Sequence, residues 1–184
     1  MKNYIINTLI FFTLALTATV CHAEEYDALL LRMQASIYPK IAMLDKKIQN
    51  KRVNDDIIFV IAHAKNELQY ANNLKKLIND EYKGKIGEHQ LIVNTSEFMK
   101  LDNSTPATAF IFLKGSRKMH AYVTDIASRN NRISFSYDHN DLKNNSLISL
   151  LIKEKAYIYL NKPVMSEYQI DFLPLFYKIV TVQE

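Results

Sequence analysis

The sequence predicts an α/β fold: a Rossmann-like, three-layer domain with a mostly parallel central sheet, helices on both faces and a C-terminal antiparallel hairpin. Residues 57–62 are an uninterrupted apolar run rich in β-branched side chains, which is typical of a strand buried on both faces. Residues 68–78 follow with the apolar spacing of an amphipathic helix, and residues 107–113 form a second apolar run that leads into another helical pattern. Residues 147–152 and 156–160 are apolar and separated by only three residues, a distance that only a hairpin bridges.

Residues 1–23 have the pattern of a secretory signal peptide. Lys2 supplies a positive charge, residues 5–16 are mostly apolar, and the segment ends in small side chains. We therefore expect cleavage after residue 23 and export of the rest of the chain. A membrane anchor is a competing interpretation, but the apolar core is shorter than the ~20 residues that span a bilayer. Lipidation of Cys21 is a second alternative, which the bulky Val20 before it disfavours.

The rest of the chain, residues 24–184, has the size of a single domain. Cys21 is the only cysteine, so cleavage after residue 23 leaves a protein without disulfides. The formal charge of +4 includes Lys2, and the other charges are mixed Lys, Asp and Glu instead of a basic stripe. We therefore expect no nucleic-acid partner.

The segment before the central strand is less regular. Residues 27–49 have helical apolar spacing, but Pro39 removes a backbone donor and disfavours helix at Tyr38, so we expect a kink or two short helices there. A polar connection then leads to the strand at 57–62, and Gly84 is the expected end of the helix that follows this strand.

The remaining elements follow in order along the chain. They are a turn at 83–88, a short strand at 90–94, a loop with a short capped helix at 95–106, a buried strand at 107–113 and a helix starting at Gly115 and Ser116. Residues 132–137 alternate polar and apolar side chains, which predicts a strand with one solvated face. After the hairpin, Asn161 begins a turn or short helix, and residues 172–182 supply a last apolar helix or strand. This order favours parallel pairing with right-handed crossovers.

A candidate ligand site lies where the parallel strands end, because open α/β sheets bind ligands outside the carboxyl ends of their strands. His63 ends the central strand and is a candidate base or ligand, although capping of the strand end by a neutral imidazole is the more common use. Lys114, Ser116 and Arg117 surround a helix start, where backbone amides and two cations would hold a small anion. The competing interpretation is a Ser-capped helix with solvated basic residues.

No pattern in the sequence indicates catalysis or a cofactor. The chain has no G-x-G-x-x-G, P-loop or G-x-S-x-G motif, and its three glycines disfavour tight wrapping of a nucleotide phosphate. His89, His120 and His139 lack the spacing of metal ligands, and residues 138–141 are expected to form a solvated turn. We therefore expect a protein that is not an enzyme, with no cofactor, no metal site and no catalytic residue.

Tyr157 and Tyr159 share one face of the predicted hairpin, with Tyr137 as a potential neighbour. Core packing is the simpler explanation of these side chains. Because tyrosine is enriched at interfaces, Tyr157 and Tyr159 are also the candidate partner-binding residues.

Residues 132–137, 146–152, 156–161 and 170–175 give the C-terminal half a specific order of elements: a strand, a linker, a hairpin whose second strand ends in Asn161, a short helix and a last leucine-containing helix. This order resembles the end of the YfiR-like family of exported bacterial proteins. The first half fits the family more loosely, through an opening helix, a hydrophobic strand and a helix rich in Ala and Leu.

The chain departs from the family pattern in three places. The family's opening helix commonly closes with Trp-Pro, where this chain has Tyr38 and Pro39. The glycine usual before the hairpin is replaced by Asn145 and Ser146, and the cysteines that some members pair are absent after residue 23. The departures affect redox control and the transfer of single residues, and leave the fold expectation unchanged.

The resemblance implies a periplasmic regulatory or sensory protein without catalysis. Such a protein binds the periplasmic part of a membrane signalling protein, of the diguanylate cyclase or histidine kinase type, and would act in cyclic-di-GMP signalling as a homodimer. A small anionic ligand at the strand ends is a further expected partner, and the signal is either such a ligand or the state of the cell envelope. The alternative is a solute-binding accessory protein of a transport system. A solute-binding protein should show a sizeable, partly polar cleft, whereas a partner-binding protein should show an exposed apolar patch.

Overall fold

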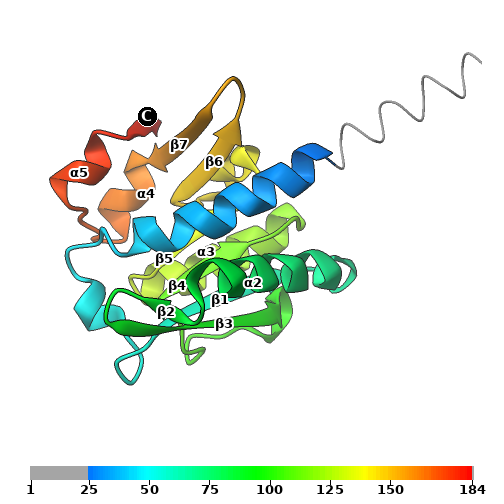
Figure 1. The fold of residues 1–184 in the computed structure, drawn as a ribbon, viewed down its shortest axis with the longest axis horizontal. Coiled ribbons are helices and arrows are strands. Elements are labelled where there is room, and N and C mark those ends of the chain that lie inside the picture. Colours follow the sequence, from blue (N-terminus) through cyan, green and yellow to red (C-terminus); the bar gives the residue numbers. More distant parts are fainter. Residues whose placement is uncertain (1–24, 184) are drawn as a thin grey trace, which may run out of the picture.

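The computed structural model describes residues 25–183 and contains one eight-stranded sheet in the order β2-β3-β1-β4-β5-β6-β7-β8 (Figure 1). The strands are β1 (Ile57–His63), β2 (Lys85–Ile86), β3 (His89–Glu97), β4 (Ala109–Phe112), β5 (Ile133–Ser136), β6 (Ile148–Ile152), β7 (Ala156–Asn161) and β8 (Val180–Gln183). The predicted signal peptide, its cleavage after residue 23 and the lipidation of Cys21 lie outside the described residues.

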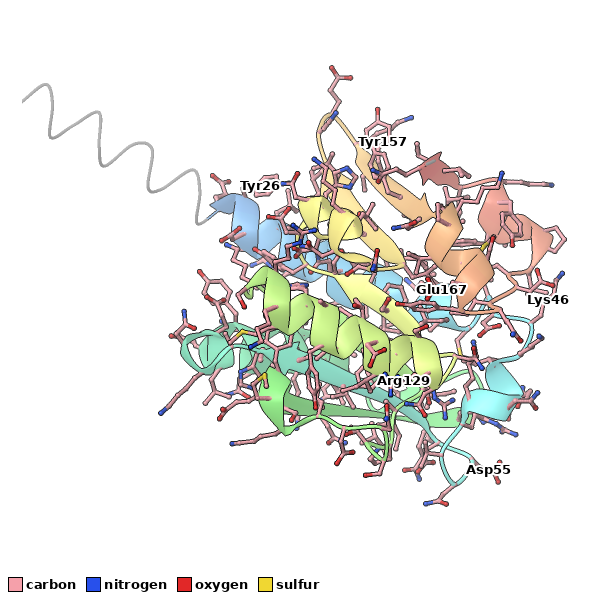
Figure 2. All side chains as sticks on the ribbon, turned by 180° about the vertical axis from the view of Figure 1, so that it is seen from behind. Tyr26, Lys46, Asp55, Arg129, Tyr157 and Glu167 are labelled. Atoms are coloured by element: carbon pink, nitrogen blue, oxygen red, sulfur yellow. The ribbon has the colours of Figure 1, made fainter. Side chains whose placement is uncertain are left out.

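Helices connect and cover these strands. They are the N-terminal helix over residues 25–42, η1 (Ile48–Lys51), η2 (Lys65–Glu67), α2 (Leu68–Tyr82), η3 (Phe98–Lys100), α3 (Arg117–Arg129), η4 (His139–Asn144), α4 (Lys162–Glu167) and α5 (Pro174–Tyr177). The N-terminal helix and α2 lie on one face of the sheet, and α3 lies on the other, as the opposite views of Figures 1 and 2 show. The predicted three-layer α/β fold is therefore confirmed.

The pairing of the strands also agrees with the predicted mixed sheet. β3, β1, β4, β5 and β6 run parallel, whereas β7 pairs antiparallel with β6 in the predicted hairpin. β8 then pairs parallel with β7 and forms one edge of the sheet, and the short β2 forms the other edge, antiparallel to β3. The carboxyl ends of the parallel strands consequently meet along one edge of the molecule.

An aromatic stack joins the N-terminal helix to the centre of the sheet. The ring of Tyr38 lies 4.4 Å from that of Phe135, which lies 6.2 Å from Phe59, and all three side chains are buried. The Tyr38 hydroxyl donates to the Ser136 carbonyl oxygen at 2.7 Å, and the Gln34 side chain donates to the Tyr137 carbonyl oxygen at 2.9 Å. Burial of each such aromatic side chain contributes about 1.5–3 kcal/mol, so this stack fixes the helix over the strand ends.

Of the two outcomes expected at Pro39, the division into two short helices is wrong. The helix continues from residue 25 through Pro39 to residue 42, and the Met43 amide still bonds to the Pro39 carbonyl oxygen at 3.3 Å. Proline costs a helix one hydrogen bond, but here the buried Tyr38 packs and bonds to the sheet in helical geometry. Tertiary packing therefore outweighs the local preference.

The predicted solvated face of the strand at 132–137 is also wrong. Ser134 and Ser136 are fully buried in β5, between β4 and β6. The Ser134 hydroxyl accepts from the Leu147 amide at 3.0 Å, and the Ser136 hydroxyl donates to the Ile148 carbonyl oxygen at 3.5 Å. Small polar side chains are tolerated inside the sheet because neighbouring backbone groups satisfy them.

Several boundaries differ from the sequence predictions. β3 extends to Glu97, beyond the strand predicted at 90–94, and in place of the expected capped helix the 95–106 loop contains the single turn η3, which has no side-chain cap. Residues 138–141 begin η4 instead of a solvated turn, and the half-buried Asp141 carboxylate lies 3.7 Å from Nε2 of the buried His120. Residues 172–182 form both α5 and the edge strand β8.

Candidate functional site

The carboxyl ends of β1, β4 and β5 define where a ligand is expected. The chain leaves β1 for β3 on one side, and β4 lies on the other side of β1, so the strand order reverses between β1 and β4. In open α/β sheets this switch point usually forms the binding crevice. The first residues beyond the three strands are Ala64, Leu113 and Tyr137.

Phe98 of η3 fills the switch point. Its side chain is 1% exposed, and its ring centroid lies 5.5 Å from the buried ring of His120. A Cβ atom on Gly115 would lie 2.7 Å from Cε2 of Phe98 and 3.3 Å from Cδ2 of His120, so the close approach of this ring requires glycine. The position where the fold normally holds a ligand is therefore closed by an apolar side chain.

The open space lies one strand further along the sheet, beneath the N-terminal helix. A cavity of about 390 Å³ lies between the start of this helix and the ends of β4, β5 and β6. We call it the crevice. Its lining residues are Tyr26, Asp27, Leu30, Lys114, Tyr137, Asp138, His139, Asn140, Leu150 and Leu151.

A charge pair crosses the crevice. Nζ of Lys114, after β4, lies 3.2 Å from Oδ2 of Asp27 on the N-terminal helix. The Tyr137 hydroxyl, after β5, donates to Oδ1 of the same carboxylate at 2.6 Å. The ammonium group also lies 5.1 Å from the centre of the Tyr137 ring, within range of a cation–π interaction. The crevice thus presents a cation and an anion side by side, and a second carboxylate, that of Asp138, also lines it.

Burial shapes the protonation of the groups around this pair. Burial raises the pKa of Tyr137, and the hydrogen bond to Asp27 raises it further, so the hydroxyl stays protonated as a donor. Burial lowers the pKa of His139, and the nearby Asp138 opposes that change. Nδ1 of His139 lies 2.9 Å from the Ser149 hydroxyl, which fixes the ring at the crevice wall.

The four ligand-site residues predicted from the sequence do not lie together. Lys114 lines the crevice, but Arg117 is exposed on the first turn of α3. The Ser116 hydroxyl accepts from the Met119 amide at 3.3 Å and so caps α3. His63 is buried, and its Nδ1 lies 2.9 Å from the Ala64 carbonyl oxygen, at the strand end. The crevice therefore includes one of the four.

Sequence reasoning missed Asp27, Tyr26 and His139. Asp27 and Tyr26 lie at the start of the first amphipathic helix, and no local pattern indicates that this end of the helix covers the strand ends. His139 belongs to the segment predicted as a solvated turn. One indication of the crevice was present in the sequence: residue 137 follows a predicted strand, so it should lie at the same edge of the sheet as residue 114.

The predicted partner-binding tyrosines lie on β7. The rings of Tyr157 and Tyr159 are 6.4 Å apart, and the Tyr159 ring lies 4.2 Å from His139, next to the crevice. Figure 2 shows Tyr157 near the tip of the hairpin, toward the same end of the molecule as Tyr26. Both tyrosines are half-buried, so they are neither core residues nor fully exposed.

A second apolar feature lies at the C-terminal edge of the sheet, on α5 and β8. We call it the C-terminal apolar surface. Its large exposed side chains are Leu173, Leu175, Tyr177, Ile179 and Val182. Because β8 has no neighbouring strand on its outer side among residues 25–183, the backbone groups of this edge can pair with a partner.

Within residues 25–183, no helix is long and apolar enough to cross a membrane. No three His, Cys, Asp or Glu side chains in this range come close enough to hold a metal ion.

Comparison with known proteins gives the fold. No family model matches the chain, and no curated protein matches it in sequence. An ABC domain from Streptococcus pneumonia, in complex with L-Trp, is similar at a TM-score of 0.51 and 9% identity, over 77% of this chain and 61% of that one. A conserved domain protein from Vibrio cholerae is similar at a TM-score of 0.51 and 10% identity, over 76% of this chain and 60% of that one. The chain thus spans about three fifths of each, and the likeness extends to the α/β fold.

Proposed function

We propose that this protein is a non-catalytic binding protein that holds a small zwitterion, of the amino-acid type, in the crevice. The observation that carries the proposal is the pair of Lys114 and Asp27 inside a cavity of about 390 Å³. Pockets for small ligands have volumes of about 300–1,000 Å³ and combine apolar walls with a few polar groups. The crevice has both, since Leu30, Leu150 and Leu151 accompany the charges.

The charges suit a ligand that carries both signs. An ion pair at a protein surface contributes roughly 0–1 kcal/mol, so little stability is lost when a ligand separates it. A ligand carboxylate would bind the Lys114 ammonium, and a ligand ammonium would bind the carboxylates of Asp27 and Asp138. Charge-assisted hydrogen bonds of this kind are about twice as strong as neutral ones. The ring of Tyr26, which is 40% exposed, gives the ligand side chain an apolar contact.

The similar structures support this class of ligand without identifying the ligand itself. The Streptococcus pneumonia domain is in complex with L-Trp, which is a zwitterion with a large apolar side chain. At 9% identity the comparison says nothing about individual contacts. The proposal therefore depends on the chemistry of the crevice, and the comparison adds that the fold accommodates such a ligand elsewhere.

We further propose that binding is sensory, and that the protein acts in the bacterial periplasm on a membrane signalling protein of the diguanylate cyclase or histidine kinase type. The resemblance to the YfiR-like family and the signal-peptide pattern of residues 1–23 support this proposal. The C-terminal apolar surface gives the partner a place to bind, because exposed apolar groups on α5 and β8 gain free energy when covered.

The second candidate is a solute-binding accessory protein of a transport system. The crevice itself favours it, because a partly polar cleft is the feature expected of such a protein. The two candidates share the ligand and differ in the partner, which is a signalling protein in the first case and a transport protein in the second.

Calorimetric titration tests the ligand site. The panel consists of natural amino acids, the amide derivatives that lack the carboxylate, and the N-acetyl derivatives that lack the ammonium. We expect amino acids to bind and both derivatives to bind at least about tenfold more weakly, because each loses one charge-assisted contact. Lys114→Gln and Asp27→Asn should each weaken binding by a similar factor, whereas Arg117→Gln should not. Equal binding of the amide derivatives would contradict the proposal.

Crosslinking in the envelope tests the partner. The full-length sequence is expressed in a bacterial host, crosslinked in intact cells and purified, and the bound proteins are identified by mass spectrometry. The variant Leu175→Asp with Ile179→Asp should lose the partner, whereas Leu68→Asp, at an exposed apolar position on α2, should retain it. Recovery of a membrane transport protein instead of a signalling protein would favour the second candidate and overturn the first.

A further inference from the structure

A second pocket lies at the opposite edge of the sheet, where the parallel strands begin. Its volume is about 220 Å³, and η1, the end of α3, the start of β5 and the loop after α4 surround it. Figure 2 shows Lys46 and Tyr26 at opposite ends of the molecule. Lys46 directly precedes Lys47, which lines this pocket, and Tyr26 lines the crevice. We call the second pocket the amino-end pocket. Its lining residues are Lys47, Asn50, Lys51, Asn130, Asn131, Arg132 and Gln169.

Positive charge exceeds negative charge at this pocket. Lys47, Lys51 and Arg132 line it, and the nearby carboxylate is that of Asp45, which is 2% exposed. Both oxygens of Asp45 have partners: Oδ2 accepts from the Lys51 ammonium, and Oδ1 accepts from the Lys47 amide at 2.9 Å. The Asp45 carboxylate thus pairs with the Lys51 ammonium, and the side chains of Lys47 and Arg132 form no ion pair within the described part of the chain.

The Arg132 guanidinium has N–H donors beyond the one that is used in a hydrogen bond to the protein. Its Nη1 donates to the Lys51 carbonyl oxygen at 2.9 Å, and within residues 25–183 it forms no ion pair with a carboxylate. The other acidic groups near this edge have cations of their own, since Asp171 pairs with Lys46 at 2.8 Å and Asp125 pairs with Arg129 at 3.0 Å. A guanidinium group offers five N–H donors in a planar fork, which matches an oxyanion with several oxygens.

The three cations lie close enough to influence one another. Burial lowers the pKa of Lys51, the hydrogen bond to Asp45 opposes that change, and the charges of Arg132 and Lys47 lower the pKa further. Charges of one sign that are gathered in a half-enclosed space repel, and an anion between them removes the repulsion. The pocket therefore favours an anionic occupant on electrostatic grounds.

We infer that the amino-end pocket is a binding site for a small oxyanion, of the phosphate or phosphorylated-polyol class, held by Arg132, Lys51 and Lys47. The amide side chains of Asn50, Asn131 and Gln169 provide both donors and acceptors, which suits the hydroxyl groups of a polyol. This site is separate from the crevice and does not depend on the proposed function.

Titration with inorganic phosphate and with glycerol 3-phosphate tests the inference, with calorimetry for affinity and amide NMR for location. We expect both probes to bind, glycerol 3-phosphate more tightly, and to shift the resonances of Asn131 and Gln169. Arg132→Gln should weaken binding about tenfold, since it removes a charge-assisted bidentate contact. Lys47→Gln, at an exposed position, should weaken binding several-fold and keeps the test valid even where Arg132→Gln impairs folding.

Two control variants separate this site from its alternatives. Arg129→Gln removes a nearby surface cation that does not line the pocket, and it should leave phosphate binding unchanged. Lys114→Gln alters the crevice, and it should also leave phosphate binding unchanged. Loss of binding in Lys114→Gln with retention in Lys47→Gln would place the anion in the crevice and overturn the inference, as would equal weakening by Arg129→Gln and Lys47→Gln.

Discussion

The switch point and the crevice lie at neighbouring strand ends of one sheet and have opposite characters. At the switch point between β1 and β4, Phe98 packs against His120 and occupies the space that Gly115 leaves. At the ends of β4 to β6, no such side chain from residues 25–183 fills the space, and a charge pair faces an open cavity. The difference shows that topology sets the edge where a ligand binds, whereas a single loop side chain decides which strand ends along that edge are accessible.

The largest loss of stability is expected when the ring that fills the switch point is removed. Phe98→Ala should lower the free energy of unfolding by about 3–5 kcal/mol, because it removes a fully buried ring and leaves a cavity. Thermal and denaturant unfolding measure the loss. The apolar cavity should then bind a small apolar probe such as benzene, as the wild-type protein should not. A loss below about 1 kcal/mol would mean that the switch point is less tightly filled than the packing indicates.

A smaller loss is expected when the glycine that admits the ring is replaced. Gly115→Ala should destabilise the protein by about 1–3 kcal/mol, because the new methyl group meets the Phe98 ring at 2.7 Å. The double variant Phe98→Ala with Gly115→Ala should lose less than the sum of the two, since the clash disappears with the ring. Strict additivity in this double-mutant cycle would contradict the account of Gly115.

The histidine behind the switch point should make stability depend on pH. Burial lowers the pKa of His120 below its ordinary value of 6.5, and the neighbouring Asp141 opposes that change. As the pH falls from about 7 to about 5.5, the unfolded state therefore binds more protons than the folded state, and stability decreases. Denaturant unfolding across this range measures the slope.

Two variants assign that slope to His120. His120→Leu should reduce it, because one titrating group is gone, and the lowered pKa of His139 accounts for the slope that remains. Asp141→Asn should steepen it, because it removes the charge that favours the protonated imidazole. The raised pKa of Asp141 acts in the other direction as the pH falls further, so stability is compared at the upper end of the pH range. An unchanged slope in His120→Leu would contradict the assignment.

The smallest effect is expected at the helix start that the sequence singled out. Arg117 is exposed on α3 and lies outside the crevice. Arg117→Gln should therefore change stability by less than about 0.5 kcal/mol and leave amino-acid binding unchanged. Thermal unfolding measures the change in stability, and calorimetry measures amino-acid binding. A marked loss of binding would move the ligand from the crevice to the start of α3.

Most of the fold was predictable from the sequence, because buried strands and hairpins leave strong periodic signals. Residues 57–62 and 107–113 are apolar without interruption, as strands covered on both faces must be. The errors occur where tertiary contacts outweigh the local pattern. Ser134 and Ser136 look solvent-facing in sequence and are buried because the backbone of the next strand satisfies them. Pro39 is expected to break the helix, but the packing and hydrogen bonding of Tyr38 against the sheet keep the helix continuous.

The candidate site was predictable only as an edge of the sheet. Lys114 was identified because it follows a buried strand, but Asp27 lies 87 residues earlier in the chain. The two meet because Tyr38 and Gln34 hold the N-terminal helix across the sheet, a contact that no spacing in the sequence encodes. The filling of the switch point was equally hidden, since Phe98 lies in a stretch that reads as a loop.

Amide NMR with a binding amino acid, for which L-tryptophan is the first probe, tests the central claim most directly. We expect saturable shifts that cluster at Asp27, Lys114 and Tyr137, with little change at Phe98 and Gly115, and we expect these shifts to disappear in Lys114→Gln. Shifts centred on Phe98, Gly115 and His120 would show that the switch point opens and binds the ligand. That result would contradict the account, as would the absence of shifts across the whole panel of amino acids.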